Sequence, residues 1–361
     1  MLSKITLYQK NLLIAFLISL AVAVLFLFWS PSQEYDLFQY FKWMDLARLF
    51  RPEETLNFFL SRGEPIFTSY LFMIAKTGLY GFLQFFPTIL TIFIIQFIPI
   101  NYCKRKNISY KLGWFAIFVF FGMYEIFLIP SGIRSSLGFA VFALALYLDL
   151  YLKNKKLSTI FYLVSPLIHL GLIIPISIRF LLKLKLRNIL VIAACILLPV
   201  LAGAGPFLAS MFSGGVYDNI FTANLYKLGN YLTPFAPISF AYFYKILKLL
   251  IILFGASFLY VIDKKDLFTK YVFLLAIFTT AFLPVYFMWY RLLELLVILF
   301  PILIINYFTS KKINLDFRKY IAGLLFIVAI VGWRVEAPYY LSGNFDINDS
   351  VPTNSTWREH E

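Results

Sequence analysis

Long apolar runs separated by short polar turns form the dominant pattern of this chain. A helix needs roughly 20 apolar residues to cross the hydrocarbon core of a bilayer. Runs close to that length lie at 12–29, 82–102, 114–129, 135–152, 189–207, 246–262, 271–290, 292–308 and 320–333. The pattern predicts an all-α fold, a polytopic helical membrane protein in which residues 1–361 form a single integral membrane domain.

Composition places the chain in the same class. Hydrophobic residues make up 61% of the sequence and charged residues 14%, whereas soluble domains carry about 25% charged residues. The first apolar run lacks the small-residue cleavage motif of a signal peptide, so we expect it to remain as the first helix. Cys103 and Cys195 show no spacing typical of a disulfide framework or a metal site.

The placement of lysine and arginine predicts the orientation. The net charge is +14, but the cations occupy short turns between apolar runs, which indicates the positive-inside rule rather than nucleic acid as a partner. Six segments that we assign to the cytoplasm contain 20 of the 32 cations: 4–10, 104–111, 153–156, 179–187, 264–270 and 311–319. The N-terminus is then cytoplasmic. The outer side holds a first loop at 30–64, a second loop at 208–237 and a C-terminal tail at 335–361.

This orientation requires two irregular segments. Segment 157–178 begins and ends beside cytoplasmic cations, and segment 66–102 must make a single net crossing. Helix breakers occur in both segments: Pro166, Gly171 and Pro175 in the first, and Gly78 and Gly81 in the second. Broken helices persist in membranes where protein or a wet cavity covers the freed backbone groups, and they commonly mark binding sites. We expect about nine to eleven membrane segments, including broken or re-entrant helices, with 157–178 either a hairpin or a single kinked span.

The outer loops have their own patterns. Loop 30–64 mixes aromatic and charged residues at helical spacing, and Pro52 divides it, which predicts two short helices on the membrane surface or, alternatively, a solvated loop. Loop 208–237 is rich in tyrosine and asparagine, which suits glycan stacking but also follows from the general composition. Its candidate glycan-binding residues are Tyr217, Tyr226 and Tyr231. Near the outer end of the next run, we expect Lys245 and Lys248 to extend toward the membrane surface.

Candidate chemistry gathers on the outer side. The sequence has no GxxxxGK[ST] loop, no GxGxxG after a strand and no HExxH, so the signals for nucleotide and zinc chemistry are missing. We therefore expect no nucleotide cofactor and no metal ligands, although a need for a divalent ion stays open. Guanidinium groups can bind pyrophosphate bidentately and stabilise a leaving group, while a carboxylate or imidazole accepts a proton from an attacking hydroxyl. Together these groups suit transfer from a phosphorylated lipid.

The candidate residues follow from that chemistry. We assign pyrophosphate binding to Arg134, Arg291 and Arg62, and catalysis to Asp36, Glu64 and His169. Each has a structural alternative. The arginines suit interfacial anchoring, the histidine suits a hydrogen-bonded core position, and the carboxylates suit solvated loops, with Glu64 also suited to cap a helix that Pro65 begins.

The order of these motifs resembles the EpsG-type polysaccharide polymerases, relatives of the Wzy O-antigen and capsule polymerases. The resemblance covers most of the chain from Tyr35 to Pro301, although each motif is short. Its elements are Tyr35-Asp36 with Tyr40, Glu64-Pro65, Gly132-Ile-Arg134-Ser-Ser-Leu137, the single His169, and Arg291 ahead of Pro301. Two positions depart from the family pattern, which commonly has glutamine in place of Ser135 and alanine in place of Gly138. A further resemblance, to C-type membrane glycosyltransferases, favours Asp36 as the catalytic carboxylate.

The resemblance implies a multi-pass enzyme of the bacterial inner membrane. Such a glycosyltransferase moves a growing glycan from undecaprenyl pyrophosphate onto the next lipid-linked repeat unit at the outer leaflet, in O-antigen, capsule or exopolysaccharide synthesis. The implied partners are the bilayer, the undecaprenyl pyrophosphate-linked oligosaccharide, a chain-length regulator and a flippase. Two alternatives stay open. One is a lipid-linked oligosaccharide flippase, which we expect to show two related halves and buried mid-span charges, and the other is an O-antigen ligase.

Overall fold

The computed structural model describes residues 6–30, 36–49, 54, 64–185, 188, 191, 240–283, 285–340 and 344–345. Within these ranges the chain is helical except for one short antiparallel pair, β1 (Trp29–Ser30) with β2 (Asn344–Phe345). The helices are α1 (Leu7–Leu27), α2 (Asp36–Leu49), α4 (Pro65–Thr77), α5 (Phe82–Lys106), α6 (Tyr110–Met123), α7 (Leu128–Ser131), α8 (Ile133–Leu150), α9 (Lys155–Ile168), the 3-10 turn η1 (Leu170–Leu172), α10 (Ile173–Leu181), α14 (Phe240–Ile262), α15 (Leu267–Ala281), α16 (Tyr286–Thr309) and α17 (Leu315–Tyr340). The predicted run 189–207, apart from residue 191, and loop 208–237 lie outside the described residues.

Five of these helices are long and apolar enough to cross a bilayer. They are α1, α5, α8, the Tyr242–Ile262 part of α14 and the Met288–Thr309 part of α16. Three shorter apolar segments accompany them: Tyr110–Met123, Leu170–Leu181 and Leu267–Ala281. The described part therefore has the architecture of a polytopic helical membrane protein, as predicted, while the expected total of nine to eleven segments stays a prediction.

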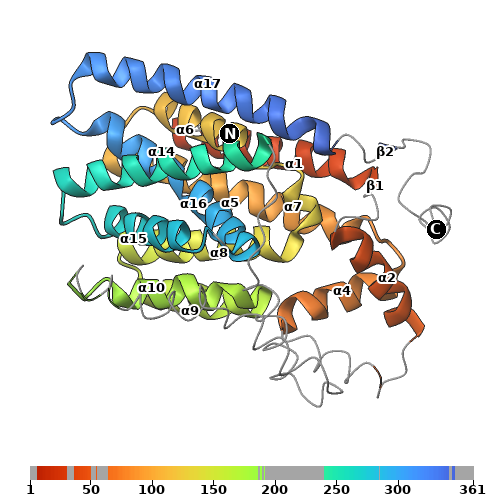
Figure 1. Ribbon diagram of the computed structural model, residues 1–361. Coiled ribbons are helices and arrows are strands. Elements are labelled where there is room, and N and C mark those ends of the chain that lie inside the picture. The colour runs from red at the N-terminus through yellow and green to blue at the C-terminus, as the bar shows by residue number, and fades with distance from the viewer. Residues whose placement is uncertain are drawn as a thin grey trace.

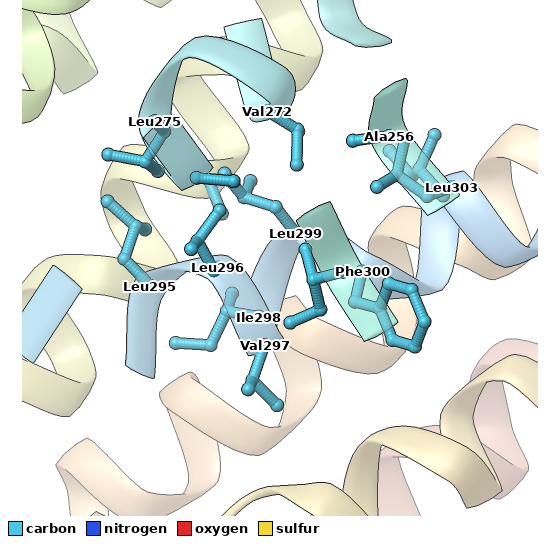
Figure 2. Close-up of a cluster of buried hydrophobic side chains, with 14 of the residues drawn as sticks. Ala256, Val272, Leu275, Leu295, Leu296, Val297, Ile298, Leu299, Phe300 and Leu303 are labelled. Carbon is cyan, nitrogen blue, oxygen red and sulfur yellow. The ribbon is translucent and has the colours of Figure 1, made fainter. Parts of the chain in front are cut away.

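Helix α16 lies at the centre of the bundle and packs against α5, α6, α8, α14 and α15. Its residues Leu292–Ile305 are almost all buried, as expected for a helix that is apolar on every side. Figure 2 shows this core, with Leu295 to Phe300 of α16 beside Val272 and Leu275 of α15 and Ala256 of α14. This buried helix holds Arg291, near its start, in a fixed position.

The two ends of the bundle differ in charge. Contacts join the basic segments in groups: Lys104 lies over the Tyr8 ring, Lys270 donates to the Leu182 carbonyl at 2.6 Å, and Lys312 donates to the Ile262 carbonyl at 2.9 Å. Asp149 joins the remaining segment, 153–156, to Arg179. We call the end of the bundle that holds these segments the basic end. The opposite end, with α2, α4, α7 and the start of α8, is the site end, at the right in Figure 1. The grouping of basic segments is confirmed; that this end faces the cytoplasm stays a prediction.

Segment 155–181 reverses direction and returns to the end of α8 at which it begins. Asp149, near the end of α8, pairs with Lys155 at the start of α9, and also accepts a 2.6 Å hydrogen bond from Nε of Arg179 near the end of α10. The reversal occurs at His169, whose backbone is extended. The 14 residues of α9 span ~21 Å, short of the roughly 30 Å hydrocarbon core. The structure therefore has the hairpin, and not the single kinked span.

The site end contains the second irregular segment. Helix α4 has 13 residues and ends at Gly78, which adopts a left-handed conformation with φ of +74°. Helix α2 packs against it, and its aromatic face, including Tyr40 and Phe41, is buried. The predicted helix in the first loop is present, but it packs on the protein instead of lying on the membrane surface alone, because its apolar face has α4 and α7 to contact.

Two predicted boundaries were wrong. We expected separate apolar segments at 271–290 and 292–308, but α15 ends at Ala281 and α16 begins at Tyr286. Hydropathy does not fall at this break, so the apolar pattern missed it, although Pro284 in the sequence is a helix-breaking signal. The predicted tail 335–361 also begins too early, since α17 continues to Tyr340.

Candidate functional site

Arg134 is the second residue of α8, where the chain emerges from a break at Gly132. Its Nε donates a 2.8 Å hydrogen bond to the Tyr40 hydroxyl, and its Nη1 pairs with the Glu64 carboxylate. The side chain is 24% exposed, so it is held by α2 and α4 rather than extended toward headgroups. Among the described residues none accepts a hydrogen bond from its Nη2. One edge of the guanidinium is fixed and another is available to a ligand.

Glu64 precedes α4 but its side chain makes no cap hydrogen bond to that helix. It contacts three groups from other elements instead. Besides Arg134, its Oε1 lies 3.5 Å from Nδ1 of His169 and accepts a 3.4 Å hydrogen bond from the Leu170 amide. Glu64 occupies the N-cap position and Pro65 begins α4, as the capping alternative predicts, but the carboxylate does not supply a cap hydrogen bond. Glu64 joins the start of α8 to the turn of the hairpin.

His169 stands at the turn of the hairpin and packs on α8. A Cβ at Gly138 would lie only 2.9 Å from the His169 Cβ, so the missing side chain allows this close approach. The Phe139 ring meets the imidazole edge-on at a centroid distance of 5.6 Å. Nδ1 faces Oε1 of Glu64 at 3.5 Å, and a carboxylate beside Nδ1 favours the tautomer that leaves Nε2 as the basic nitrogen.

Arg291 reaches the same region from α16. Its Nη1 donates to the Ser135 hydroxyl at 2.9 Å and lies 3.2 Å from the buried Glu294, while its Nη2 lies 3.9 Å from Asp36 at the start of α2. Ser135 follows Arg134 directly, so Arg291 contacts the first turn of α8 at the residue next to Arg134. Asp36 is 48% exposed and is the most open carboxylate of the group.

Burial and charge set the ionisation at the site end. Burial by itself would raise the pKa of Glu64, but hydrogen bonding to His169 and the charge of Arg134 outweigh it and lower that pKa from 4.5 to about 2. Burial raises the pKa of the Tyr40 hydroxyl above its ordinary value. Glu64 is therefore an anion and Tyr40 a neutral hydroxyl at neutral pH, so both hold Arg134 in place without accepting a proton from substrate.

A second ionic cluster was missed by the sequence analysis. Lys245 lies 2.8 Å from Glu125, which accepts a 2.7 Å hydrogen bond from the Tyr290 hydroxyl, and Lys248 donates to the Met123 carbonyl at 2.7 Å. All three charged side chains are buried. The expectation that both lysines extend to the membrane surface was wrong, because α6 and α16 supply partners inside the protein. Their spacing of three residues within an apolar run was the available signal.

Five predicted site residues come together at the site end: Asp36, Glu64, Arg134, His169 and Arg291. They come from five separate segments of the chain. Arg62 and the predicted glycan-binding residues Tyr217, Tyr226 and Tyr231 lie outside the described residues. In the described ranges, no three His, Cys, Asp or Glu side chains are grouped as metal ligands. The arrangement offers two guanidiniums for an anion and two groups, Asp36 and His169, that can accept a proton.

Comparison with known proteins identifies no relative. No family model matches the chain, and neither curated proteins nor solved structures give a significant match. The site geometry and the short motifs therefore carry the functional argument.

Proposed function

We propose that this protein is a polymerase of lipid-linked oligosaccharide repeat units. It transfers the growing glycan from undecaprenyl pyrophosphate to the next lipid-linked repeat unit at the outer leaflet of a bacterial inner membrane. The observation that carries the proposal is the placement of Arg134 on the first turn of α8, where Arg291 is hydrogen-bonded to the adjacent Ser135, beside the Glu64–His169 pair. A sugar on a lipid pyrophosphate is already activated, so such a site needs no nucleotide.

The two arginines have the central role. Each guanidinium can form parallel hydrogen bonds to pyrophosphate oxygens and stabilise the charge that develops on the leaving group. Ser135 and Glu294 hold Arg291, as Tyr40 and Glu64 hold Arg134. Side chains positioned before substrate binds need little reorganisation during the reaction. Both arginines are partly exposed, so lipid pyrophosphate at the membrane surface can reach them.

Either Asp36 or His169 accepts the proton from the attacking hydroxyl. Asp36 lies at the exposed mouth of the site beside Arg291, and His169 lies deeper, oriented by Glu64. A base must come within hydrogen-bond reach of the acceptor hydroxyl. The open position of Asp36 favours it for an acceptor sugar that enters from outside, with Glu64 as the residue that orients His169 and Arg134.

Replacement of Arg134 by lysine tests the proposal. Lysine keeps the charge but cannot form the planar bidentate contact, so Arg134→Lys should abolish long glycan chains while single repeat units still reach the cell surface. Arg334→Lys, at an exposed position in α17, is the matched control and should give normal chains. Electrophoresis of the surface polysaccharide measures both. A normal chain-length distribution in Arg134→Lys would reject the polymerase.

A flippase is the second candidate, since Lys248 and Glu294 are buried within α14 and α16. Charges inside membrane helices commonly mark transport paths. Buried charges in the membrane helices are one of the two features that we expect of a flippase, so these two residues favour it. The Arg134→Lys experiment separates the two functions, because a flippase variant should lose surface repeat units altogether instead of displaying single ones.

A further inference from the structure

An apolar groove runs along one side of the bundle between α14, α16 and α17. Its volume is about 670 Å³, within the range of cavities that bind whole ligands. Leucine, isoleucine and phenylalanine form most of its walls, among them Phe254 of α14, Leu303 of α16 and Leu324 of α17. Phe254 and Leu324 are strongly exposed in the chain itself. The groove therefore opens toward the surroundings of the bundle, which for this protein is the hydrocarbon of the bilayer.

The groove lies in the basic half of the bundle. Its α16 residues, Phe300 to Phe308, belong to the second half of that helix, and its α17 residues, Phe317 to Leu325, belong to the first half of the helix that returns. The proposed catalytic site is at the opposite end (Figure 1). A molecule in this groove would sit at the depth of the leaflet next to the basic end, so it is distinct from the substrate of the site end.

The wall chemistry favours a flexible acyl chain over a transmembrane helix. Helices pack on one another through surfaces of small residues that let backbones approach, but here bulky side chains from α14, α16 and α17 line the groove. Gly255 is one of its few small residues, and a Cβ at that position would meet nothing within 4 Å. The space beside Gly255 is open and apolar, and the groove around it is lined mostly by leucine, isoleucine and phenylalanine side chains, as suits a hydrocarbon chain.

Charge at the mouth of the groove indicates the headgroup. The turn between α14 and α15 and the turn between α16 and α17 close its basic end, and Lys312 joins them by donating to the Ile262 carbonyl at 2.9 Å. Within 263–266 and 310–319, six cations stand against three carboxylates. Basic clusters at the end of membrane helices attract anionic lipids, at a gain of about fivefold in affinity for each cation near the surface.

We propose that this groove is a binding site for one anionic phospholipid from the leaflet at the basic end. An acyl chain occupies the space beside Gly255, and the phosphate lies at the turn that contains Lys311 and Lys312. The site is independent of the polymerase proposal, because it uses no residue of the site end. A lipid held here joins α17 to α14, which contact each other little elsewhere along their length.

Filling the groove tests the acyl-chain part of the proposal. Gly255→Leu places a side chain in the open space and also favours the helix, so the variant should fold. Gly323→Leu is the matched control, because Gly323 is equally open but does not line the groove. Native mass spectrometry of the purified chain should show retained phosphatidylglycerol on the parent and on Gly323→Leu. Retention by Gly255→Leu should fall roughly tenfold, since displacing even two methylenes of the acyl chain has that effect.

Neutralising the turn tests the headgroup part. The parent should prefer phosphatidylglycerol over phosphatidylcholine of the same acyl chains. Lys311→Gln with Lys312→Gln should reduce that preference by at least about fivefold and leave total lipid retention intact. Lys153→Gln with Lys156→Gln, in the α8–α9 turn, is the matched control and should keep the preference.

Three results would overturn the proposal. The first is equal phosphatidylglycerol retention by Gly255→Leu and the parent. The second is a parent that shows no headgroup preference. The third is a change of oligomeric state in Gly255→Leu without a change in bound lipid, which would make a second copy of the chain the occupant. None of these outcomes bears on glycan polymerisation, which the Arg134→Lys experiment measures separately.

Discussion

Oε1 of Glu64 lies 3.5 Å from Nδ1 of His169, although Glu64 precedes α4 and His169 lies at the turn of the hairpin, far along the chain. The same carboxylate pairs with Arg134 through its other oxygen. Glu64 therefore sets the relative position of an imidazole and a guanidinium. Its replacement should affect both groups at once, whereas replacement of either partner should affect one.

The acid sensitivity of folding should depend on Glu64. Its pKa of about 2 in the folded chain lies below the ordinary 4.5. Between these two pH values Glu64 is therefore protonated more often in the unfolded chain than in the folded one. The stabilisation from Glu64 is then complete above about pH 5 and disappears as the pH falls toward 2. Thermal unfolding in detergent should show the parent more stable than Glu64→Gln at neutral pH, with the difference shrinking on acidification. Asp316→Asn, in an exposed pair with Lys319, should show little difference at any pH, and a constant gap for Glu64→Gln would contradict the prediction.

The hairpin should depend on Asp149 at its base. This carboxylate is only 5% exposed and contacts both Lys155 and Arg179. Asp149→Asn removes the negative charge from two cations, one of them largely buried, and breaking a buried pair by removing one partner costs about 3–5 kcal/mol. Lys155 is 68% exposed, so Lys155→Ala should cost no more than about 1 kcal/mol. Thermal unfolding compares the two, and equal losses would show that the Asp149 pair does not hold the hairpin.

Gly138 should be required for the position of His169. An alanine Cβ there would lie 2.9 Å from the His169 Cβ and 3.0 Å from Cδ1 of Leu172, so the turn of the hairpin would have to move away from α8. Misplacement by about 1 Å can reduce catalysis about a hundredfold. Gly138→Ala should therefore shorten the glycan chains, whereas Gly255→Ala, at an open helical position, should not. Full-length chains from Gly138→Ala would show that His169 has no positional role.

Substitutions of Asp36 and His169 should identify the residue that accepts the proton during polymerisation. If Asp36 is the base, Asp36→Asn abolishes chain extension at every pH, because an amide cannot accept the proton. His169→Gln should then retain slow extension, since glutamine can keep a polar contact with Glu64 while losing the basic nitrogen. Chain extension in vitro from purified lipid-linked repeat units measures both variants. The reverse result, activity in Asp36→Asn and none in His169→Gln, would move the base to His169.

Several features followed from the sequence because they depend on local composition. Apolar length predicted the membrane helices, with α8 found at 133–150 against a predicted 135–152, and the spacing of cations predicted which turns share one end of the bundle. Gly78 predicted the end of α4, because glycine readily adopts the positive φ found there. Pro166 and Gly171 indicated only the region of the hairpin turn, since Pro166 lies inside α9, Gly171 lies inside η1, and the reversal occurs at His169. The break between α15 and α16 was missed, because aromatic residues continue through it and hide it from hydropathy.

Only the tertiary structure decided how the polar residues pair. The sequence singled out Asp36, Glu64, Arg134, His169 and Arg291 by type and by predicted side, but the Glu64–Arg134 and Glu64–His169 contacts depend on how α4, α8 and the hairpin pack. The same holds for Lys245 and Lys248, which the bundle buries against Glu125 and the Met123 carbonyl. A charged side chain at a helix end lies in the headgroups or in the protein according to whether a partner helix supplies an opposite charge. That choice is made by long-range packing, which apolar periodicity does not encode.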